Sequence, residues 1–230
     1  MPPILPVILA GGVGSRLWPL SEKGYPKQFS TIVGQENFLR KTIRRLTSSS
    51  FVSFEPPIII TNIDYKPLFA REMKDVVDGL GTLMFEPEGK NTAPAILAAC
   101  LTAYQSNRDT TLLVSPSDHY IDPVIDFHKS IKDAGEVVDL EKIVTFGVLP
   151  TSAETGYGYL ELDTLNNFSE GIFKVNRFVE KPNIELAKFM IGSGKYYWNS
   201  GVFMFKAETM ISAFKKLLPE VYSIVKNLHF

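Results

Sequence analysis

Short apolar segments alternate with helix-like segments through the first 147 residues, and this alternation restricts the fold more than any other feature of the sequence. Apolar segments of strand length, rich in Ile, Val and Leu, occur at residues 4–9, 57–61, 82–85, 110–114 and 142–147. Helix-like segments occur between them, at residues 36–46, 65–77, 92–104 and 124–138. Repeated β–α alternation predicts a Rossmann-like α/β fold, in which a mixed, mostly parallel sheet carries helices on both faces.

The pattern changes after Pro150, where the apolar segments become richer in aromatic and turn residues. Strands are predicted at residues 156–162, 173–180 and 202–206, and helices at residues 184–191 and 208–228. We expect these strands to add antiparallel or mixed pairs to the same sheet rather than to build an independent domain. The sequence therefore predicts a single domain over residues 1–230, with one half at residues 1–150 and the other at residues 151–230.

Charge and cysteine content exclude several classes of protein. Lys and Arg total 24 and Asp and Glu total 25, and the scattered basic residues argue against nucleic-acid and membrane partners. Lys41, Arg44 and Arg45 are predicted to form a solvated helix face. Cys100 is the one cysteine, so an internal disulfide is excluded and a reducing cytoplasm is the natural setting. The first residues lack the basic flank of a signal peptide, and no apolar segment approaches the length of a membrane-spanning helix.

The first predicted strand runs into the segment Leu9-Ala10-Gly11-Gly12-Val13-Gly14-Ser15-Arg16. Glycines allow the main chain to approach an anion closely, and the forked donors of Arg16 suit phosphate oxygens. The spacing is neither that of the dinucleotide fingerprint nor that of the P-loop. Lys27 follows Arg16 by eleven residues, and the two cations would neutralise a triphosphate if both returned to this segment. An ordinary strand-to-helix turn with two surface cations is the alternative, and the glycines alone leave it open.

The segment Ala10–Leu20, followed by Tyr25-Pro26-Lys27-Gln28-Phe29, resembles the signature of the sugar-nucleotide pyrophosphorylases, or nucleotidylyltransferases. Its particular form is most similar to the mannose-1-phosphate guanylyltransferases of bacteria. Further segments match this family in the expected order, at residues 89–95, 112–120, 155–160, 178–182 and 198–205. The resemblance implies the fold of the nucleotide-diphospho-sugar transferases, with nucleotide bound by residues 1–150 and sugar phosphate by residues 151–230.

The resemblance also implies a reaction. GMP would pass from GTP to α-D-mannose 1-phosphate, giving GDP-mannose and pyrophosphate without a covalent enzyme intermediate. The segment Gly89–Ala95 favours GTP, because uridylyl and thymidylyl relatives tend to carry a glutamine-containing sequence there. A relative that uses UTP or dTTP, and a non-catalytic sugar-nucleotide-binding subunit, remain as alternatives.

The family's C-terminal portion usually supplies a second metal-binding aspartate and then a β or isomerase domain. Residues 206–230 contain no equivalent of that aspartate, so we expect a short catalytic core.

Site residues follow from the matched segments. The predicted catalytic residues are Arg16, Lys27 and Asp118. The predicted nucleotide-binding residues are Leu9, Ala10, Gly11, Gly12, Gly14, Ser15, Arg16, Asn91, Thr92 and Ser117. The predicted sugar-phosphate-binding residues are Lys27, Tyr157, Gly158, Glu180, Lys181, Asn199 and Gly201. The sequence leaves room for a homodimer.

Asp118 is predicted to hold Mg²⁺, because it follows an apolar strand and magnesium prefers carboxylates together with phosphate oxygens. Several of the predicted site residues also have a purely structural interpretation. Asp118 would form an Asx turn, and Asn91 or Thr92 would cap a helix. Gly158 would mark a β-bulge, and the neighbouring Glu180 and Lys181 would form a surface ion pair.

Overall fold

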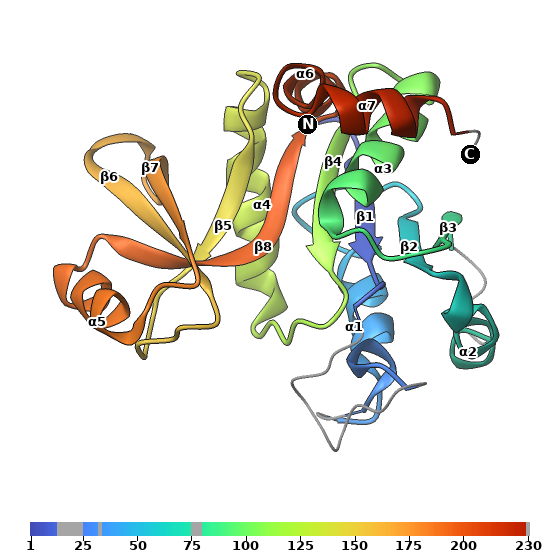
Figure 1. Cartoon of the computed structure of the whole chain (residues 1–230), viewed down its shortest axis with the longest axis horizontal. Helices are drawn as coiled ribbons and strands as arrows, with labels where there is room; N and C mark the ends of the chain where they lie inside the picture. The colour runs from blue at the N-terminus through green and yellow to red at the C-terminus, as the bar shows by residue number, and fades with distance from the viewer. Residues whose placement is uncertain (13–24, 32–33, 75–79, 229–230) are drawn as a thin grey trace. The chain divides into compact units, whose positions relative to one another are not determined.

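The structure is a computed structural model that describes residues 1–12, 25–31, 34–74 and 80–228 (Figure 1). Its chain forms two compact units. The first unit consists of Met1–Ile143 together with Met204–Phe230, and the second of Val144–Phe203. The predicted halves divide at residue 150 instead, so the structure assigns the last part of the chain to the N-terminal unit.

The first unit is built on parallel strands. These are β1 (Leu5–Leu9), β2 (Ile58–Asn62), β3 (Thr82–Glu86) and β4 (Thr111–Pro116), in the order β3-β2-β1-β4. Their side chains are buried on β1, β2 and β4, where Val7, Leu112 and Val114 are fully shielded from solvent. Such burial on both faces explains why these segments read as continuous apolar runs. The predicted parallel α/β class is confirmed.

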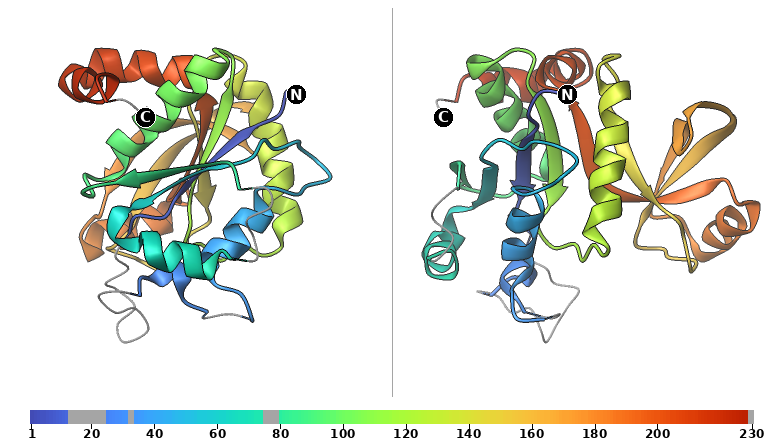
Figure 2. Two further views of the ribbon diagram at one scale, coloured as in Figure 1. Left: turned by 90° about the vertical axis from the view of Figure 1, so that its right-hand side faces the viewer. Right: turned by 180° about the vertical axis from the view of Figure 1, so that it is seen from behind.

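Helices cover both faces of this parallel sheet. They are α1 (Phe38–Arg45), α2 (Lys66–Glu72), α3 (Thr92–Ser106), α4 (Val124–Val138), α6 (Ala207–Leu217) and α7 (Pro219–Lys226). Figure 2 shows α3, α6 and α7 on one side of the sheet and α1 and α4 on the other. Short 3₁₀ helices occur at Lys27–Phe29 (η2) and Ile63–Tyr65 (η3). Cys100 is buried in α3 as a free thiol, as the sequence predicts.

The second unit contains antiparallel strands. Its elements are β5 (Val144–Val148), β6 (Gly158–Ser169), β7 (Ile172–Glu180), α5 (Ile184–Ser193) and most of β8 (Tyr196–Lys206). β6 lies between β7 and β8 and is antiparallel to both, while β5 pairs with β8. A small core gathers around Tyr159, Ala187, Met190 and Tyr196. The antiparallel strands expected after Pro150 are therefore present.

Several predicted elements differ in extent from those of the structure. β8 begins at Tyr196 rather than residue 202, because Tyr196–Trp198 pair with β6. β6 continues to Ser169 because it pairs with β7 along a long hairpin. The final helix is interrupted at Leu218, where Pro219 starts a new helix.

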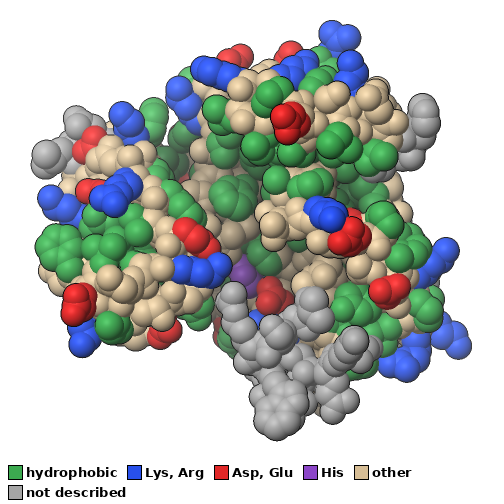
Figure 3. Space-filling view, viewed as in Figure 1, with side chains coloured by type: hydrophobic (Ala, Val, Ile, Leu, Met, Phe, Trp, Pro, Cys, Tyr) green, Lys and Arg blue, Asp and Glu red, His purple; other side chains and the backbone are tan. Residues whose placement is uncertain are grey.

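The surface of the described residues carries both signs of charge. On the face drawn in Figure 3, Lys and Arg side chains are interspersed with Asp and Glu side chains. Among the described residues, no helix is both long and apolar enough to cross a membrane. Arg45 departs from the prediction of a solvated helix face, because its side chain is buried, with 5% of its surface exposed.

Candidate functional site

The end of β1 is fixed by hydrogen bonds around Ala10. Its amide donates to the carbonyl of Ile60 at 2.7 Å. Its carbonyl accepts from Nε2 of Gln28 at 2.7 Å and from Oγ1 of Thr61 at 2.9 Å. Gln28 is only 2% exposed, so this buried amide attaches the 3₁₀ helix η2 to the strand end. The same helix begins with Lys27, whose position is thereby linked to β1.

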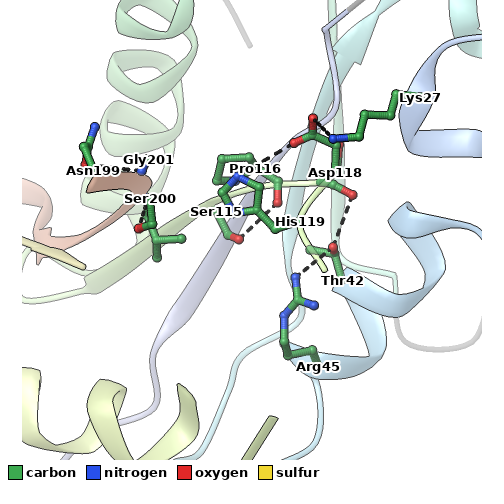
Figure 4. A network of polar contacts seen from close by, with 12 residues as sticks. Lys27, Thr42, Arg45, Ser115, Pro116, Asp118, His119, Asn199, Ser200 and Gly201 are labelled. Atoms are coloured by element: carbon green, nitrogen blue, oxygen red, sulfur yellow. Dashed lines mark hydrogen bonds and ion pairs between the residues drawn. The ribbon is translucent and has the colours of Figure 1, made fainter. Parts of the chain in front are cut away.

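Lys27 and Asp118 point toward one another in Figure 4. Nζ of Lys27 lies 3.1 Å from Oδ2 of Asp118, and the two side chains are 25% and 38% exposed. Asp118 comes just after β4, whose end is joined to β1 by a hydrogen bond from the amide of Ser117 to the carbonyl of Leu9. Ligands of parallel α/β sheets bind beyond the carboxyl ends of the strands, where this pair lies. The structure therefore brings together two of the three predicted catalytic residues.

Arg16, the third predicted catalytic residue, lies outside the described residues, as do Gly14 and Ser15. Gly11 and Gly12 follow the end of β1 directly. Among the described residues, no atom lies within 4 Å of the place where a Cβ would stand at Gly12. The described part of the glycine segment therefore continues directly from the carboxyl end of the central strand.

His119 neighbours the carboxylate of Asp118. Its Nε2 lies 4.0 Å from Oδ1 of that residue. Burial lowers the pKa of the His119 imidazole, and the charges of Arg45 and Lys27 lower it further, while Asp118 acts in the opposite direction. The ring is consequently neutral at neutral pH.

Glu86 lies beside the glycine segment, and the sequence interpretation did not include it among the candidate residues. It is the last residue of β3, and one of its carboxylate oxygens lies 3.1 Å from the position that a Cβ would take at Gly11. The side chain is partly buried, and burial raises the pKa of its carboxyl group. An acidic residue closing a predicted strand at the ligand-binding edge is the signal that could have identified it.

Asn91 and Thr92 stand at the start of α3. Asn91 occupies the N-cap position with φ 63° and ψ −170°, and its side chain makes no capping hydrogen bond. Asn91 therefore occupies the predicted N-cap position, but its side chain does not accept a hydrogen bond from the first helical turn. The main-chain amides of that turn need acceptors from elsewhere, and both residues are exposed.

The predicted sugar-phosphate residues of β6 and β7 lie together in the second unit. Gly158 pairs with Glu180, and the carbonyl of Tyr157 accepts from the amide of Lys181 at 3.1 Å. A Cβ at Gly158 would lie 2.9 Å from a carboxylate oxygen of Glu180, so glycine is needed for this close approach. Lys181 has φ 44° and places Nζ 2.9 Å from Oε1 of Glu180.

Asn199 and Gly201 belong to the neighbouring strand β8. Tyr159 pairs with Trp198 across β6 and β8, and the ring of Tyr157 meets that of Trp198 edge-on, with centroids 5.2 Å apart. Oδ1 of Asn199 accepts from Oγ1 of Thr145 at 2.9 Å and from the amide of Gly201 at 3.2 Å. The predicted sugar-phosphate residues of this unit are thus held on three adjacent strands.

The fit of a divalent metal rests on Asp118. Among the described residues, no group of three or more His, Cys, Asp or Glu side chains could hold a metal ion. Magnesium is commonly held by one or two carboxylates and completed by substrate phosphate oxygens. A partly exposed carboxylate at the strand edge fits that partial role.

Comparison with known proteins relates the chain to enzymes of nucleotide transfer. A model of the family described as nucleotidyl transferase matches residues 5–229. The chain is 44% identical to mannose-1-phosphate guanylyltransferase RfbM of Salmonella typhimurium over 220 residues, which cover 95% of this chain and 45% of that protein. It is 40% identical to the xanthan biosynthesis protein XanB of Xanthomonas campestris pv. campestris, over 96% of this chain and 46% of that protein. The chain therefore spans about half the length of these curated relatives.

A solved structure supports the same relation. The crystal structure of a Thermus thermophilus protein, described as a mannose-1-phosphate geranyltransferase, superposes with a TM-score of 0.85. The two sequences are 30% identical, and the match covers 97% of this chain and 63% of that one.

Proposed function

Because the chain belongs to the nucleotidyl transferase family, we propose that it is a mannose-1-phosphate guanylyltransferase. The reaction transfers GMP from GTP to α-D-mannose 1-phosphate and forms GDP-mannose and pyrophosphate. The observation that carries the proposal is the Lys27–Asp118 pair at the carboxyl ends of β1 and β4, in a chain 44% identical to RfbM.

The reaction requires mainly that the two substrates are aligned and that their negative charges are neutralised. A phosphate oxygen of the sugar phosphate forms a bond to the α-phosphorus of GTP, and the bond to the leaving pyrophosphate breaks on the opposite side. Both substrates are anions, so a cation between them lowers the barrier. Lys27 is assigned to the α-phosphate and the incoming sugar phosphate, and Arg16 with the amides of the glycine segment to the β- and γ-phosphates. The nucleotide site is also assigned Leu9, Ala10 and Ser117.

Asp118 is the residue that would hold Mg²⁺, together with phosphate oxygens of GTP and water. When bound, the ion would neutralise phosphate charge and make the α-phosphorus more electrophilic. In the structure, Asp118 instead contacts Nζ of Lys27. Asp118 therefore sets the position of that cation as well as offering a ligand.

The second unit is assigned to mannose 1-phosphate. Glu180 offers an acceptor to sugar hydroxyls and Lys181 offers a cation to the sugar phosphate, next to Tyr157 and Gly158. Oδ1 of Asn199 is engaged by Thr145. The amide nitrogen of Asn199 is therefore the group assigned to a sugar oxygen.

Glu86 supports guanine as the base. Guanine presents two adjacent donors, N1–H and the N2 amino group, and a carboxylate accepts both at once. Glu86 carries a partly buried carboxylate at the strand edge beside Gly11, and the exposed turn at Asn91 and Thr92 is assigned to the same base. Uracil and thymine present a single donor on that edge, so the arrangement favours GTP over UTP or dTTP.

A nucleotide panel tests the proposed function. Pyrophosphate release is measured with mannose 1-phosphate or glucose 1-phosphate, and with GTP, inosine triphosphate, UTP or dTTP, in the presence and absence of Mg²⁺. GTP with mannose 1-phosphate should be the preferred pair, and Glu86→Gln should reduce the preference for GTP over inosine triphosphate. Faster turnover with UTP or dTTP would replace the proposal by its sister activity, and GTP binding without any turnover would favour a non-catalytic subunit.

The use of the product, the cellular location and the oligomeric state are part of the same proposal. XanB is named for xanthan biosynthesis, and by analogy the GDP-mannose formed here would serve polysaccharide biosynthesis. A cytoplasmic location agrees with the single buried thiol. A homodimer is also proposed, and sedimentation of the purified chain tests it.

A further inference from the structure

Arg45 is a buried cation that the proposed reaction does not use. It is the last residue of α1, and its side chain is 5% exposed. One guanidinium nitrogen donates to Oγ1 of Thr42 at 3.0 Å (Figure 4), while Nε is buried and has no hydrogen-bond partner in the described part of the chain. The guanidinium lies 5.8 Å from the ring centre of Phe127.

No carboxylate among the described residues forms an ion pair with Arg45. Burial alone lowers the pKa of Arg45 to about 10, so the group keeps its charge at neutral pH. Burying a charge is unfavourable unless an opposite charge or a full set of hydrogen bonds offsets it. A buried polar group left without partners in a native fold calls for a specific explanation, and a missing ion or ligand is one.

A cavity of about 370 Å³ opens beside this cation. It lies in the first unit, between α1 and the segment that leads into α4, and its charged lining consists of Glu36, Lys41, Arg44 and Arg45. The carboxylate of Glu36 already forms an ion pair with Arg44, with 2.5 Å between Oε1 of Glu36 and a guanidinium nitrogen of Arg44. The polar side chains of His119 and Tyr120 also line the cavity. Nζ of Lys41 lies 5.7 Å from the ring centre of Tyr120. The volume is within the range of small-molecule sites.

We propose that this cavity binds a small phosphate-bearing anion, either inorganic phosphate or a phosphomonoester, with Arg45 as its main counter-charge. The forked guanidinium matches phosphate oxygens, and the charged lining contains three cationic side chains and one carboxylate, which is paired with Arg44. Lys27 and Asp118 are not among the residues that line it. The cavity therefore shares none of the residues assigned to the reaction, although its lining includes His119, the neighbour of Asp118.

The experiment measures the thermal unfolding midpoint of the ligand-free protein in sodium phosphate and in sodium chloride at equal ionic strength. Phosphate should raise the midpoint of the wild type. Because phosphate would also enter the reaction site, Lys27→Ala serves as a reference that should retain the part of the shift due to the cavity. Arg45→Met should lose that part, with an apparent phosphate affinity about tenfold to a hundredfold weaker, as expected when a charge-assisted hydrogen bond is removed.

Arg108→Met is the matched control, because Arg108 also lies over an aromatic ring, 5.5 Å from the ring centre of Tyr104, but is exposed. It should leave the phosphate effect unchanged. Titration with mannose 1-phosphate in the Lys27→Ala background distinguishes the two sources of phosphate. Mannose 1-phosphate can still bind the second unit in that background, so only the part of its effect that Arg45→Met removes is compared with that of inorganic phosphate. Whichever ligand gives this Arg45-dependent part at lower concentration is the better occupant.

Exposed Ser48 also lines the cavity and supplies a second test if Arg45→Met does not fold. Ser48→Glu adds a carboxylate to the lining of the cavity and should weaken the phosphate effect. Ser48→Gln adds a side chain of the same size without the charge and should not weaken it. An unchanged phosphate response in Arg45→Met or in Ser48→Glu overturns the proposal. So does a response that disappears with Lys27→Ala alone, which would confine phosphate to the reaction site.

Discussion

At the scale of single residues, loss of Lys27 or Asp118 should affect turnover far more than folding stability. Exposed ion pairs contribute roughly 0.2–1 kcal/mol to folding, and both partners are partly exposed here. Removing a group that neutralises transition-state charge typically costs about 10²–10³ in turnover. Lys27→Ala and Asp118→Ala should therefore lower pyrophosphate release by at least about a hundredfold, while the unfolding midpoint changes little.

Lys129→Ala provides the control for this pair. It removes an ion pair to Asp126 of the same 3.1 Å length, on the exposed face of α4. The control variant should match the others in stability and the wild type in turnover. Near-normal turnover in Lys27→Ala or Asp118→Ala would remove that residue from the mechanism.

Gln28 is expected to act as a positioning residue. Gln28 and Thr61 both donate to the carbonyl of Ala10, but only Gln28 belongs to the 3₁₀ helix that begins with Lys27. Gln28→Met and Thr61→Val should each reduce the free energy of unfolding by about 1 kcal/mol, the typical value of one hydrogen bond. Turnover should fall in Gln28→Met alone, with a larger change in kcat than in the KM for GTP. Equal turnover in the two variants would show that the amide has a structural role only.

Glu86 gives a prediction about pH. Burial raises the pKa of its carboxyl group in the folded chain, so ionisation there is less favourable than in the unfolded chain. The folded state consequently loses stability as the pH rises through the folded-state pKa. Glu86→Gln should be more stable than the wild type near neutral pH, and this difference should shrink below the ordinary carboxyl pKa. Urea unfolding at a series of pH values measures it.

The exposed neighbour Glu88, which pairs with Lys90 at the surface, offers a control for this experiment. Glu88→Gln should show no comparable dependence on pH. A Glu86→Gln variant that is less stable than the wild type near neutral pH would mean that the carboxylate has a stabilising partner.

At the scale of elements, local pattern predicted the strands and helices of the first unit well. The helix expected at residues 124–138 has the same bounds in the structure, because its apolar periodicity and the preceding proline are local signals. The early start of β8 was not predictable in this way, since Tyr196–Trp198 become a strand through pairing with β6. Glu86 and Arg45 were missed for a similar reason. The position of Glu86 depends on which strand ends beside the glycine segment, and the burial of Arg45 depends on which face of its helix is covered. Both are decided by contacts between residues that are distant in the sequence.

The β6–β7 hairpin offers a test of the sugar-phosphate site. A Cβ at Gly158 would lie 2.7 Å from the ring of Phe178 and 2.9 Å from the carboxylate of Glu180. Both groups are ends of side chains, so the strand should survive Gly158→Ala while Glu180 moves. The expected result is a KM for mannose 1-phosphate raised by about tenfold or more, as when a charge-assisted hydrogen bond is weakened. The KM for GTP should not change.

Gly156→Ala is the matched control, because no atom in the described part of the chain lies within 4 Å of a Cβ at that nearby glycine. Its kinetics should equal those of the wild type. A Gly158→Ala variant with an unchanged KM for mannose 1-phosphate would exclude Glu180 from sugar binding.

At the scale of the whole molecule, the two compact units divide the predicted site residues between them. Lys27, Asp118, Gly11 and Gly12 belong to the first unit, and the predicted residues from Tyr157 to Gly201 belong to the second. Under the proposed assignment, a reaction between two bound substrates draws on residues of both units, whereas binding of each substrate alone draws mainly on one. Each unit can therefore be tested separately.

Hydrogen exchange with single substrates makes this separation measurable. A ligand slows the opening of the segments that bind it, by up to about a hundredfold at a concentration of 100 Kd. GTP alone should protect amides at residues 25–31, 86–92 and 116–119, and mannose 1-phosphate alone should protect those at residues 157–160 and 178–182. Peptides of α7 serve as a reference, because neither ligand is assigned to that helix. Protection of residues 178–182 by GTP alone would contradict the assignment of the second unit to the sugar phosphate, whereas protection confined to the expected segments would tie each substrate to its own unit.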